Sequence, residues 1–310
     1  MSLKLSCREK NMVNLLIRKM VEDDRWDVAE LICVSTNYWY EQHGLERIFT
    51  GPERAEVFYQ VSGGMEGSVG IVAELGGRLA GSCFYHVRET HVSLGIMNAH
   101  PNYFGQGVAR GLLAYIIKVA EGLDKPIRLV SSALNLNSFS LYTRAGFVPR
   151  CVYQDIALTV PKEGIVGRAE GVRAASLADV EGMAAIELEV SGISRAGDYR
   201  YFIDNPDGFW HVSVSEGENG ELSGFLVSSG GMLGPGVART EGEAVALLLA
   251  ELDRLRGRNV VFLVPVACAD LVQRVYGWGG RNCELHFAQV RGAYREIAGV
   301  SLPTFMPETG

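Results

Sequence analysis

The sequence predicts an α/β (α+β) protein made of two similar domains, on the basis of its length, its pattern and an internal repeat. Its 310 residues exceed the roughly 100–200 of a single domain. Strand-like and helix-like stretches alternate along the chain, and their order starts again after Pro161. We therefore divide the chain into a loose leader at residues 1–12, a first domain at 13–160 and a second domain at 165–310.

The composition is that of an ordinary globular protein, with 47% apolar and 21% charged residues. A net charge of −7 argues against a nucleic-acid partner and is compatible with a cationic substrate. Six cysteines without CxxC or CxxH spacing argue against a zinc site or a disulfide scaffold, and favour a reducing cytoplasm. The chain shows neither a signal peptide nor an apolar run near the ~20 residues of a membrane span, so we expect no membrane partner.

The first domain opens with a strand at Val13–Met20, and the acidic residues that follow favour a helix running through Ile32. An aromatic-rich segment at 35–59 follows, and these aromatics either belong to the core or line an acceptor site. Next come two apolar runs, Val69–Leu75 and Arg78–Val87, which flank Gly76-Gly77. Two glycines between such runs predict a β-hairpin.

The rest of the first domain alternates strands and helices. A strand at His91–Ala99 leads into a glycine-rich turn, and Leu112–Gly122 has the apolar period of a helix packed on a sheet. Strands at Ile127–Ser132 and Cys151–Thr159 complete the domain.

The second domain repeats this order with shorter connections. Ile17-Arg18 and Asp24 align with Val172-Arg173 and Asp179 at an offset of 155, and the hairpin residues 77–81 align with 220–224 at 143. An offset of 134 then aligns Tyr142 and Gly146 with Tyr276 and Gly280. Steadily falling offsets indicate the same elements in the same order.

The turn at 100–113 has the features of a phosphate site. Gly105 and Gly107 carry no Cβ, so backbone N–H groups can approach a ligand closely, and the helix that follows adds free N–H groups and the positive end of its dipole. The best partner is a pyrophosphate. No Gly-Lys-Ser/Thr follows, which excludes a P-loop, and Arg110 replaces the third glycine of a dinucleotide motif.

A second motif follows one helix and one strand later. It has a polar start, a short helix and a Gly-Phe exit, and its defining residues are Asn135, Ser138, Tyr142, Gly146 and Phe147.

Together the two segments resemble the GNAT superfamily of acyl-CoA-dependent N-acetyltransferases. The first GNAT motif reads Arg/Gln-x-x-Gly-x-Gly/Ala, and the second reads Asn-x-x-Ala/Ser-x-x-x-Tyr-x-x-x-Gly-Phe. The second motif is matched throughout. In the first motif Gly107 and Ala109 match, whereas Phe104 stands at the Arg/Gln position and removes one side-chain contact.

The resemblance implies that each domain is a mostly antiparallel mixed sheet flanked by helices, and that the protein uses acetyl-CoA to acetylate a primary amine by direct attack in a ternary complex. The acceptor is an unidentified amine, which we expect to be a small molecule. No metal is needed. The implied cofactor residues are Met97, Ala99, Phe104, Gly105, Gln106, Gly107, Val108, Ala109, Arg110, Asn135 and Ser138.

For catalysis the resemblance points to Tyr142 as the general acid that protonates the departing thiolate. The base remains open between a carboxylate, an imidazole and a water chain. Glu89 with His91 is the first choice by position, and the other candidates are Glu41, His43 and His86.

The second domain has lost this chemistry. An offset of 133 places Gly107–Arg110 on Thr240–Glu243, where Thr240 and Glu243 predict a capping box that occupies the helix donors. The position of Asn135 becomes Ala269. This loss, with Phe104, supports an alternative function as a non-catalytic module that binds acyl-CoA or a partner.

Overall fold

The computed structural model describes residues 15–167, 169–217 and 220–307, so the predicted leader lies outside the described residues. The chain forms two compact units, each assembled from separate stretches of sequence. The first comprises Met1–Glu56, Gly70–Cys83 and Met97–Tyr115, and the second comprises Val57–Val69, Phe84–Ile96 and Ile116–Gly310. For the repeat we keep the predicted boundaries and call residues 13–160 the first copy and 165–310 the second copy.

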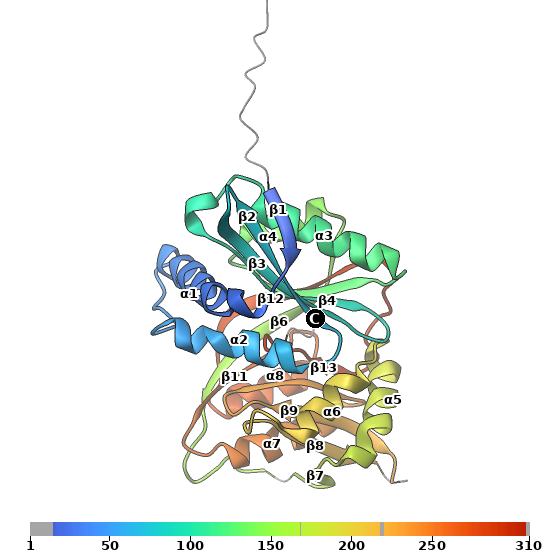
Figure 1. Cartoon of the computed structure of the whole chain (residues 1–310). Helices are drawn as coiled ribbons and strands as arrows, with labels where there is room; N and C mark the ends of the chain where they lie inside the picture. Colours follow the sequence, from blue (N-terminus) through green and yellow to red (C-terminus); the bar gives the residue numbers. More distant parts are fainter. Residues whose placement is uncertain (1–14, 168, 218–219, 308–310) are drawn as a thin grey trace, which may run out of the picture. The chain divides into compact units, whose positions relative to one another are not determined.

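Apart from β13 (Val300–Leu302), which follows the second copy's last matching strand, the two copies contain the same helices and strands in the same order (Figure 1), which bears out the predicted repeat. The first copy contains β1 (Leu15–Lys19), α1 (Arg25–Gln42), α2 (Pro52–Gly64), β2 (Ser68–Leu75), β3 (Arg78–Val87), β4 (Val92–Ala99), α3 (Val108–Gly122), β5 (Ile127–Ser132), α4 (Leu136–Arg144) and β6 (Val148–Thr159). The second contains β7 (Val172–Ala174), α5 (Val180–Ser191), α6 (Ala196–Asp204), β8 (His211–Glu216), β9 (Leu222–Ser228), β10 (Met232–Ala238), α7 (Glu241–Arg254), β11 (Asn259–Pro265), α8 (Ala269–Gly277), β12 (Arg281–Arg291) and β13 (Val300–Leu302).

The first helix is longer than the sequence predicted. It continues past Ile32 to Gln42 because no residue breaks it before Gly44, whose φ of +71° ends the helical path. A second helix, α2, begins at Pro52, a residue that favours the first helical turn. The aromatic-rich segment at 35–59 is therefore mostly helical.

In the first unit the strands follow the order β1-β2-β3-β4, and β1 pairs antiparallel with β2. The hairpin between β2 and β3 is confirmed, with Gly76 at φ +58° and Gly77 at +74°. Arg18 on β1 forms ion pairs with Asp24 and Glu74, both at 2.7 Å.

The same three-residue contact recurs in the second copy. Arg173 on β7 pairs with Asp179 at 2.7 Å and with Glu216 at 2.6 Å. The repeat is thus present in side-chain contacts as well as in element order.

In the second unit the two copies exchange strands. The order there is β4-β5-β12-β6-β11-β10-β9-β8-β7, with β13 on β10. Strand β12 of the second copy lies between β5 and β6 of the first, and β6 in turn lies between β12 and β11. The strand expected at Cys151–Thr159 begins at Val148 and does not simply complete the first domain, because both its neighbours belong to the second copy.

The sheet is mixed and mostly antiparallel, as the sequence predicted. Only β4–β5 and β10–β11 are parallel among the pairings described. Helices α7 and α8 pack their apolar residues on β11 in one core that includes Leu248, Leu252, Phe262 and Leu271.

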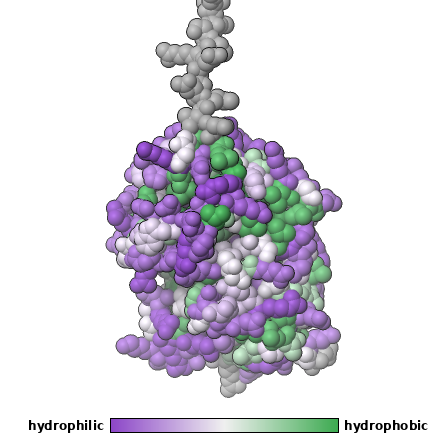
Figure 2. All heavy atoms as spheres, in the orientation of Figure 1, coloured by the Kyte–Doolittle hydropathy of each residue, from purple (hydrophilic) through white to green (hydrophobic). Residues whose placement is uncertain are grey.

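The face shown in Figure 2 is mainly hydrophilic, with hydrophobic residues in separate small groups, as is usual for globular proteins. Within the described part of the chain, no helix combines the length and apolar character needed to cross a bilayer.

Candidate active site

The glycine-rich turn has the backbone geometry that its sequence suggested. His100 starts a short 3-10 turn at Pro101–Tyr103, and its Nδ1 accepts a hydrogen bond from the N–H of Asn102 at 3.1 Å. Gly105 and Gly107 follow with φ of +76° and +87°. These are left-handed conformations that glycine adopts without strain, and they turn the chain into α3.

Five N–H groups at the end of this turn and the start of α3 have no acceptor among the described residues. They are the N–H groups of Gly105, Gly107, Val108, Ala109 and Arg110. The start of a helix leaves such donors unsatisfied and adds the positive end of its dipole. Five free donors around one turn suit an anion with several oxygens.

The side chains around the turn differ in their surroundings. Phe104 is 54% exposed and packs edge-on against Tyr38, with ring centroids 5.8 Å apart. Gln106 donates from its side-chain amide to the carbonyl of Asn102, and Arg110 is exposed on the first turn of α3. The turn therefore presents backbone donors and one cation, and no acidic side chain.

Strand β4 separates from β5 before its end. The two strands pair only at Val92 and Ser93, so among the described residues the half of β4 that carries Met97 and Ala99 has no partner on β5. The resemblance assigned Met97 and Ala99 to the cofactor, and both lie on this half of β4.

Asn135 begins the second motif as the N-cap of α4. Its side-chain oxygen accepts a hydrogen bond from the N–H of Ser138 at 3.0 Å. This contact gives a structural reason for an asparagine three residues before a serine, because it fixes the start of the short helix.

Tyr142 lies on the buried side of α4. It is 6% exposed, and its ring is tilted against Phe147 at a centroid distance of 5.8 Å. Phe147 leaves the helix after Gly146, whose φ is +88°. The Gly-Phe exit thus holds the tyrosine ring in place.

The two residues preferred as the base lie just before β4, whereas the glycine turn follows it. Glu89 is exposed, and its carboxylate accepts a hydrogen bond of 3.4 Å from the N–H of Gly197 at the start of α6. His91 is fully buried.

Burial, together with the positive charges of Arg88, Arg195, Arg128 and Lys125, keeps the pKa of His91 well below 6.5. A neutral imidazole buried among cations is poorly suited to accept a proton from an ammonium group.

The other candidate bases are also held by neighbours. Glu41 forms an ion pair with Arg47, and His43 stacks on Trp39 at 4.2 Å. His86 is buried and lines a small cavity, and desolvation keeps its pKa well below 6.5.

In the second copy, the start of α7 is closed by its own side chains. Thr240 Oγ1 accepts from the N–H of Glu243 at 3.2 Å, and the Glu243 carboxylate accepts from the N–H of Thr240 at 2.8 Å. This is the capping box that the sequence predicted. In addition, Glu241 accepts a hydrogen bond of 2.7 Å from the N–H of Leu271 in the first turn of α8.

The structure corrects the predicted alignment of the second motif. Helices α4 and α8 begin at 136 and 269, which is an offset of 133 and not 134. The counterpart of Asn135 is therefore Cys268 and not Ala269, and the counterpart of Tyr142 is the buried Val275 and not Tyr276.

The exit from the helix confirms this register. The N–H of Phe147 bonds the carbonyl of Tyr142, and the N–H of Gly280 bonds that of Val275. A tyrosine in the neighbouring position misled the sequence comparison, and its hydroxyl bonds Gln154 instead. The second copy has lost both the asparagine and the tyrosine of the motif.

Comparison with known proteins agrees with this geometry. Residues 27–147 match the family model described as the acetyltransferase (GNAT) family. A search of curated proteins gives no match.

Several solved structures share the fold over nearly the whole chain. A candidate acetyltransferase from Pyrococcus horikoshii has a TM-score of 0.74 at 17% identity, covering 94% of this chain and 95% of that one. A GCN5-related N-acetyltransferase from Sphaerobacter thermophilus has a TM-score of 0.62 at 17% identity, covering 91% and 97%.

A tandem GNAT protein from the clavulanic acid biosynthesis pathway has a TM-score of 0.58 at 14% identity, covering 91% and 100%. Residues 27–147 thus belong to the acetyltransferase (GNAT) family, within a chain that has the fold of a tandem GNAT protein.

Proposed function

We propose that the chain is an acetyl-CoA-dependent N-acetyltransferase whose first copy carries the chemistry. The observation that supports this most directly is the set of five free N–H groups at the start of α3. They would bind the pyrophosphate of acetyl-CoA, with Arg110 as a flanking cation and Phe104 in contact without a charge. Asn135 and Ser138 would hold the start of α4 against the cofactor.

The remaining roles follow from the reaction. The amine nitrogen attacks the thioester carbonyl carbon, so a C–N bond forms as the C–S bond breaks. N–H groups at Met97 and Ala99, on the half of β4 that has no partner on β5 among the described residues, would polarise the carbonyl. The ammonium group first gives one proton to a base, which leaves the neutral amine that attacks. Tyr142 gives its hydroxyl proton to the departing sulfur, and the nitrogen then loses a second proton, which restores the Tyr142 hydroxyl.

The acceptor would be a primary amine of a small molecule. The net charge of −7 is compatible with a cationic acceptor and unfavourable for nucleic acid. We also propose a cytoplasmic location, since the described cysteines are all free thiols.

A non-catalytic module that binds acyl-CoA or a partner is the second candidate. Phe104 at the Arg/Gln position and the closed helix start of the second copy favour it. Binding without acetyl transfer to any primary amine would support this candidate over the enzyme.

Calorimetric titration of the full chain with acetyl-CoA tests the cofactor assignment. We expect one site, which Gly107→Glu should abolish because it adds a negative charge at the free donors. Gly107→Asn is the matched control, since asparagine tolerates the left-handed conformation and is neutral. Unchanged affinity in Gly107→Glu would refute the phosphate site, and two sites would show that the second copy also binds.

A further inference from the structure

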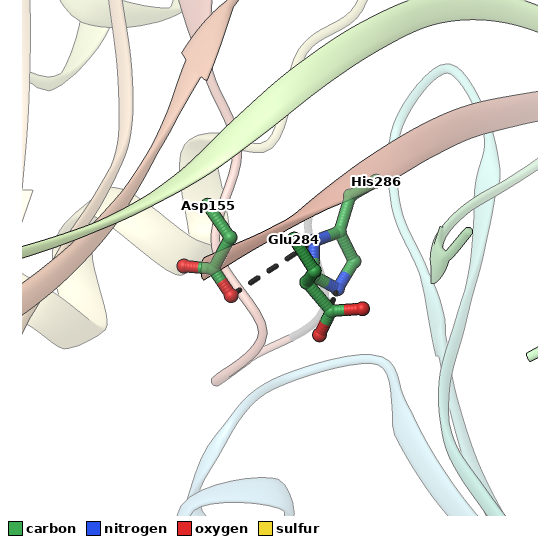
Figure 3. Close-up of side chains that lie close together, drawn as sticks. All are labelled: Asp155, Glu284 and His286. Atoms are coloured by element: carbon green, nitrogen blue, oxygen red, sulfur yellow. Dashed lines mark ion pairs between the residues drawn. The ribbon is translucent and has the colours of Figure 1, made fainter. Parts of the chain in front are cut away.

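Strand exchange brings together three titratable side chains from the two copies. Asp155 on β6 pairs in register with Glu284 on β12, and His286 lies two residues further along β12. Residues two apart on a strand share a face, so the three side chains point toward one another (Figure 3).

The contacts within this cluster are close and leave acceptors unused. His286 Nδ1 lies 3.9 Å from Asp155 Oδ2, and His286 Nε2 lies 3.6 Å from Glu284 Oε1 (Figure 3). Both separations exceed a hydrogen bond. Asp155 Oδ1 and His286 Nδ1 are buried and have no hydrogen-bond partner among the described residues.

The cluster is buried, with side-chain exposures of 6% for His286, 12% for Glu284 and 17% for Asp155. The ring of Phe305 covers the imidazole at a centroid distance of 4.7 Å. Buried polar atoms without partners are costly, so each calls for a partner from outside the described residues, such as a water molecule, an ion or a ligand.

Two other buried carboxylates of the second unit are matched by arginine, whereas the buried Glu251 pairs with His211. Glu187 pairs with Arg195 at 2.6 Å, and Asp198 pairs with Arg88 at 2.6 Å. Within the described chain, no arginine or lysine forms an ion pair with Asp155. A cation from outside the chain would supply the missing charge.

The ligand atoms of the cluster lie close enough to surround one cation. One oxygen or nitrogen atom from each residue can be chosen so that all lie within 4.8 Å of one another. Three hydrogen bonds of about 2.8 Å from one tetrahedral nitrogen place their acceptors about 4.6 Å apart, and zinc ligands at about 2.1 Å lie about 3.4 Å apart. The measured separations of 3.9 and 3.6 Å lie between these two values, so either cation requires some movement of the side chains.

The cluster is joined to the second motif through β5. Ser132, the last residue of β5, donates a short hydrogen bond to Glu284, and its Oγ accepts from the N–H of Leu134 at 3.1 Å. The next residue, Asn135, caps the helix that carries Tyr142. The three side chains thus lie beside the segment assigned to acetyl transfer.

We propose that Asp155, Glu284 and His286 bind the ammonium group of the acceptor amine, so that the second copy completes the acceptor site through β12. This inference rests on the proposed acetyltransferase function. With its proton on Nε2, beside Glu284, His286 presents its Nδ1 lone pair to the ligand. One ammonium N–H bond then breaks as its proton passes to the Asp155 carboxylate, which leaves a neutral amine.

The full chain with ¹³C-labelled histidine allows a direct test by nuclear magnetic resonance, with butylammonium chloride as the probe. We expect a saturable shift of the His286 ring signals, which His286→Asn identifies. The neutral analogue 1-butanol should produce no such shift. Glu284→Gln and Asp155→Asn should each weaken binding at least about tenfold, the effect of losing one charged hydrogen bond.

Glu216→Gln is the matched control, because it removes one carboxylate charge from a surface pair with Arg173. The proposal is overturned if butylammonium gives no saturable shift, or if the Gln and Asn variants bind it normally. It is also overturned if only Zn²⁺, added to chelator-treated protein, produces a shift that Asp155→Asn removes. Titrating acetyl-CoA into the same samples tests the acetyltransferase function separately from the cation site. If acetyl-CoA does not bind but butylammonium does, the proposed function is refuted and the cation site remains.

Discussion

The two copies of the repeat begin equivalent helices in different ways, with a left-handed Gly107 before α3 and an extended Thr240 before α7. At the start of α3, five N–H groups have no acceptor among the described residues. At the start of α7, Thr240 and Glu243 satisfy each other, and Glu241 reaches across to the first turn of α8. Free donors suit a ligand, whereas satisfied donors stabilise the helix itself.

The difference shows how one fold can be divided between two tasks. The second copy has lost its open helix start and its tyrosine, yet it contributes β12 to the sheet of the first copy. A copy whose helix start is closed can therefore still be required, because it supplies side chains and a strand.

Making the start of α3 resemble the start of α7 should have the largest effect, and this effect should be on acetyl-CoA affinity. Gly107→Thr with Arg110→Glu copies Thr240 and Glu243 into α3. The new carboxylate should occupy the donors and repel phosphate, so we expect calorimetry to show acetyl-CoA affinity several hundredfold lower, or about 3.5 kcal/mol.

The control for this double variant is Glu243→Ala in the second copy, which should leave acetyl-CoA affinity within about twofold. If the double variant binds acetyl-CoA normally, the free donors of α3 do not hold its phosphates, and the contrast between the copies has no functional meaning.

Removing the hydroxyl of Tyr142, which has no counterpart in the second copy, should have the next largest effect, and this effect should be on turnover. Val275 occupies the position of Tyr142, so the proposed acid is present in one copy only. Tyr142→Phe should lower kcat roughly 100-fold with acetyl-CoA affinity unchanged, because a general acid contributes about that much. Release of the CoA thiol during turnover measures this.

Tyr276→Phe separates the two alignments of the repeat. The sequence aligned Tyr276 with Tyr142, but the structure places it one residue away with its hydroxyl on Gln154. We expect normal turnover in Tyr276→Phe. A loss of turnover as large as that in Tyr142→Phe would show that the structural register does not identify the acid.

Local patterns predicted most of the fold. The glycine pair at 76–77, the apolar period of α3 and the capping box at Thr240 each depend on neighbouring residues, and each was found. The exchange of β6 and β12 was not predictable in this way. Strand pairing between distant segments leaves no local mark, and both strands alternate as they would within a single domain.

The candidate site also has parts that neighbouring residues predict and parts that depend on residues far apart in the sequence. The glycine turn and the Asn135 motif are contiguous in sequence, and so they could be found by spacing. The Asp155 cluster combines residues about 130 positions apart, and its members have no motif of their own. The choice of His91 as a base could not take Arg128 and Arg195 into account, because these arginines come from distant parts of the chain; Arg88 is a near neighbour in sequence.

Asp155 and Asp179 should affect the free energy of unfolding in opposite directions, each by about 1–2 kcal/mol. Burial and the charge of Glu284 raise the pKa of Asp155 to about 7, whereas Arg173 holds the pKa of Asp179 at about 2. A raised pKa means that the folded state favours the protonated acid, so stability is lost as the pH rises from about 4 to 7. A lowered pKa has the opposite sign, and that contribution is lost as the pH falls from about 4 to 2.

Urea unfolding at pH 5 and pH 8 measures this difference. At pH 8, Asp155→Asn should be more stable than the parent by about 2 kcal/mol, and the gain should shrink at pH 5, where the parent's carboxyl is mostly protonated. Asp179→Asn should be less stable than the parent at both pH values by about 1 kcal/mol, since its partly exposed ion pair is screened by water. If Asp155→Asn is destabilising at pH 8, the carboxylate is already compensated in the free protein, and the case for an external cation at the exchanged strands is lost.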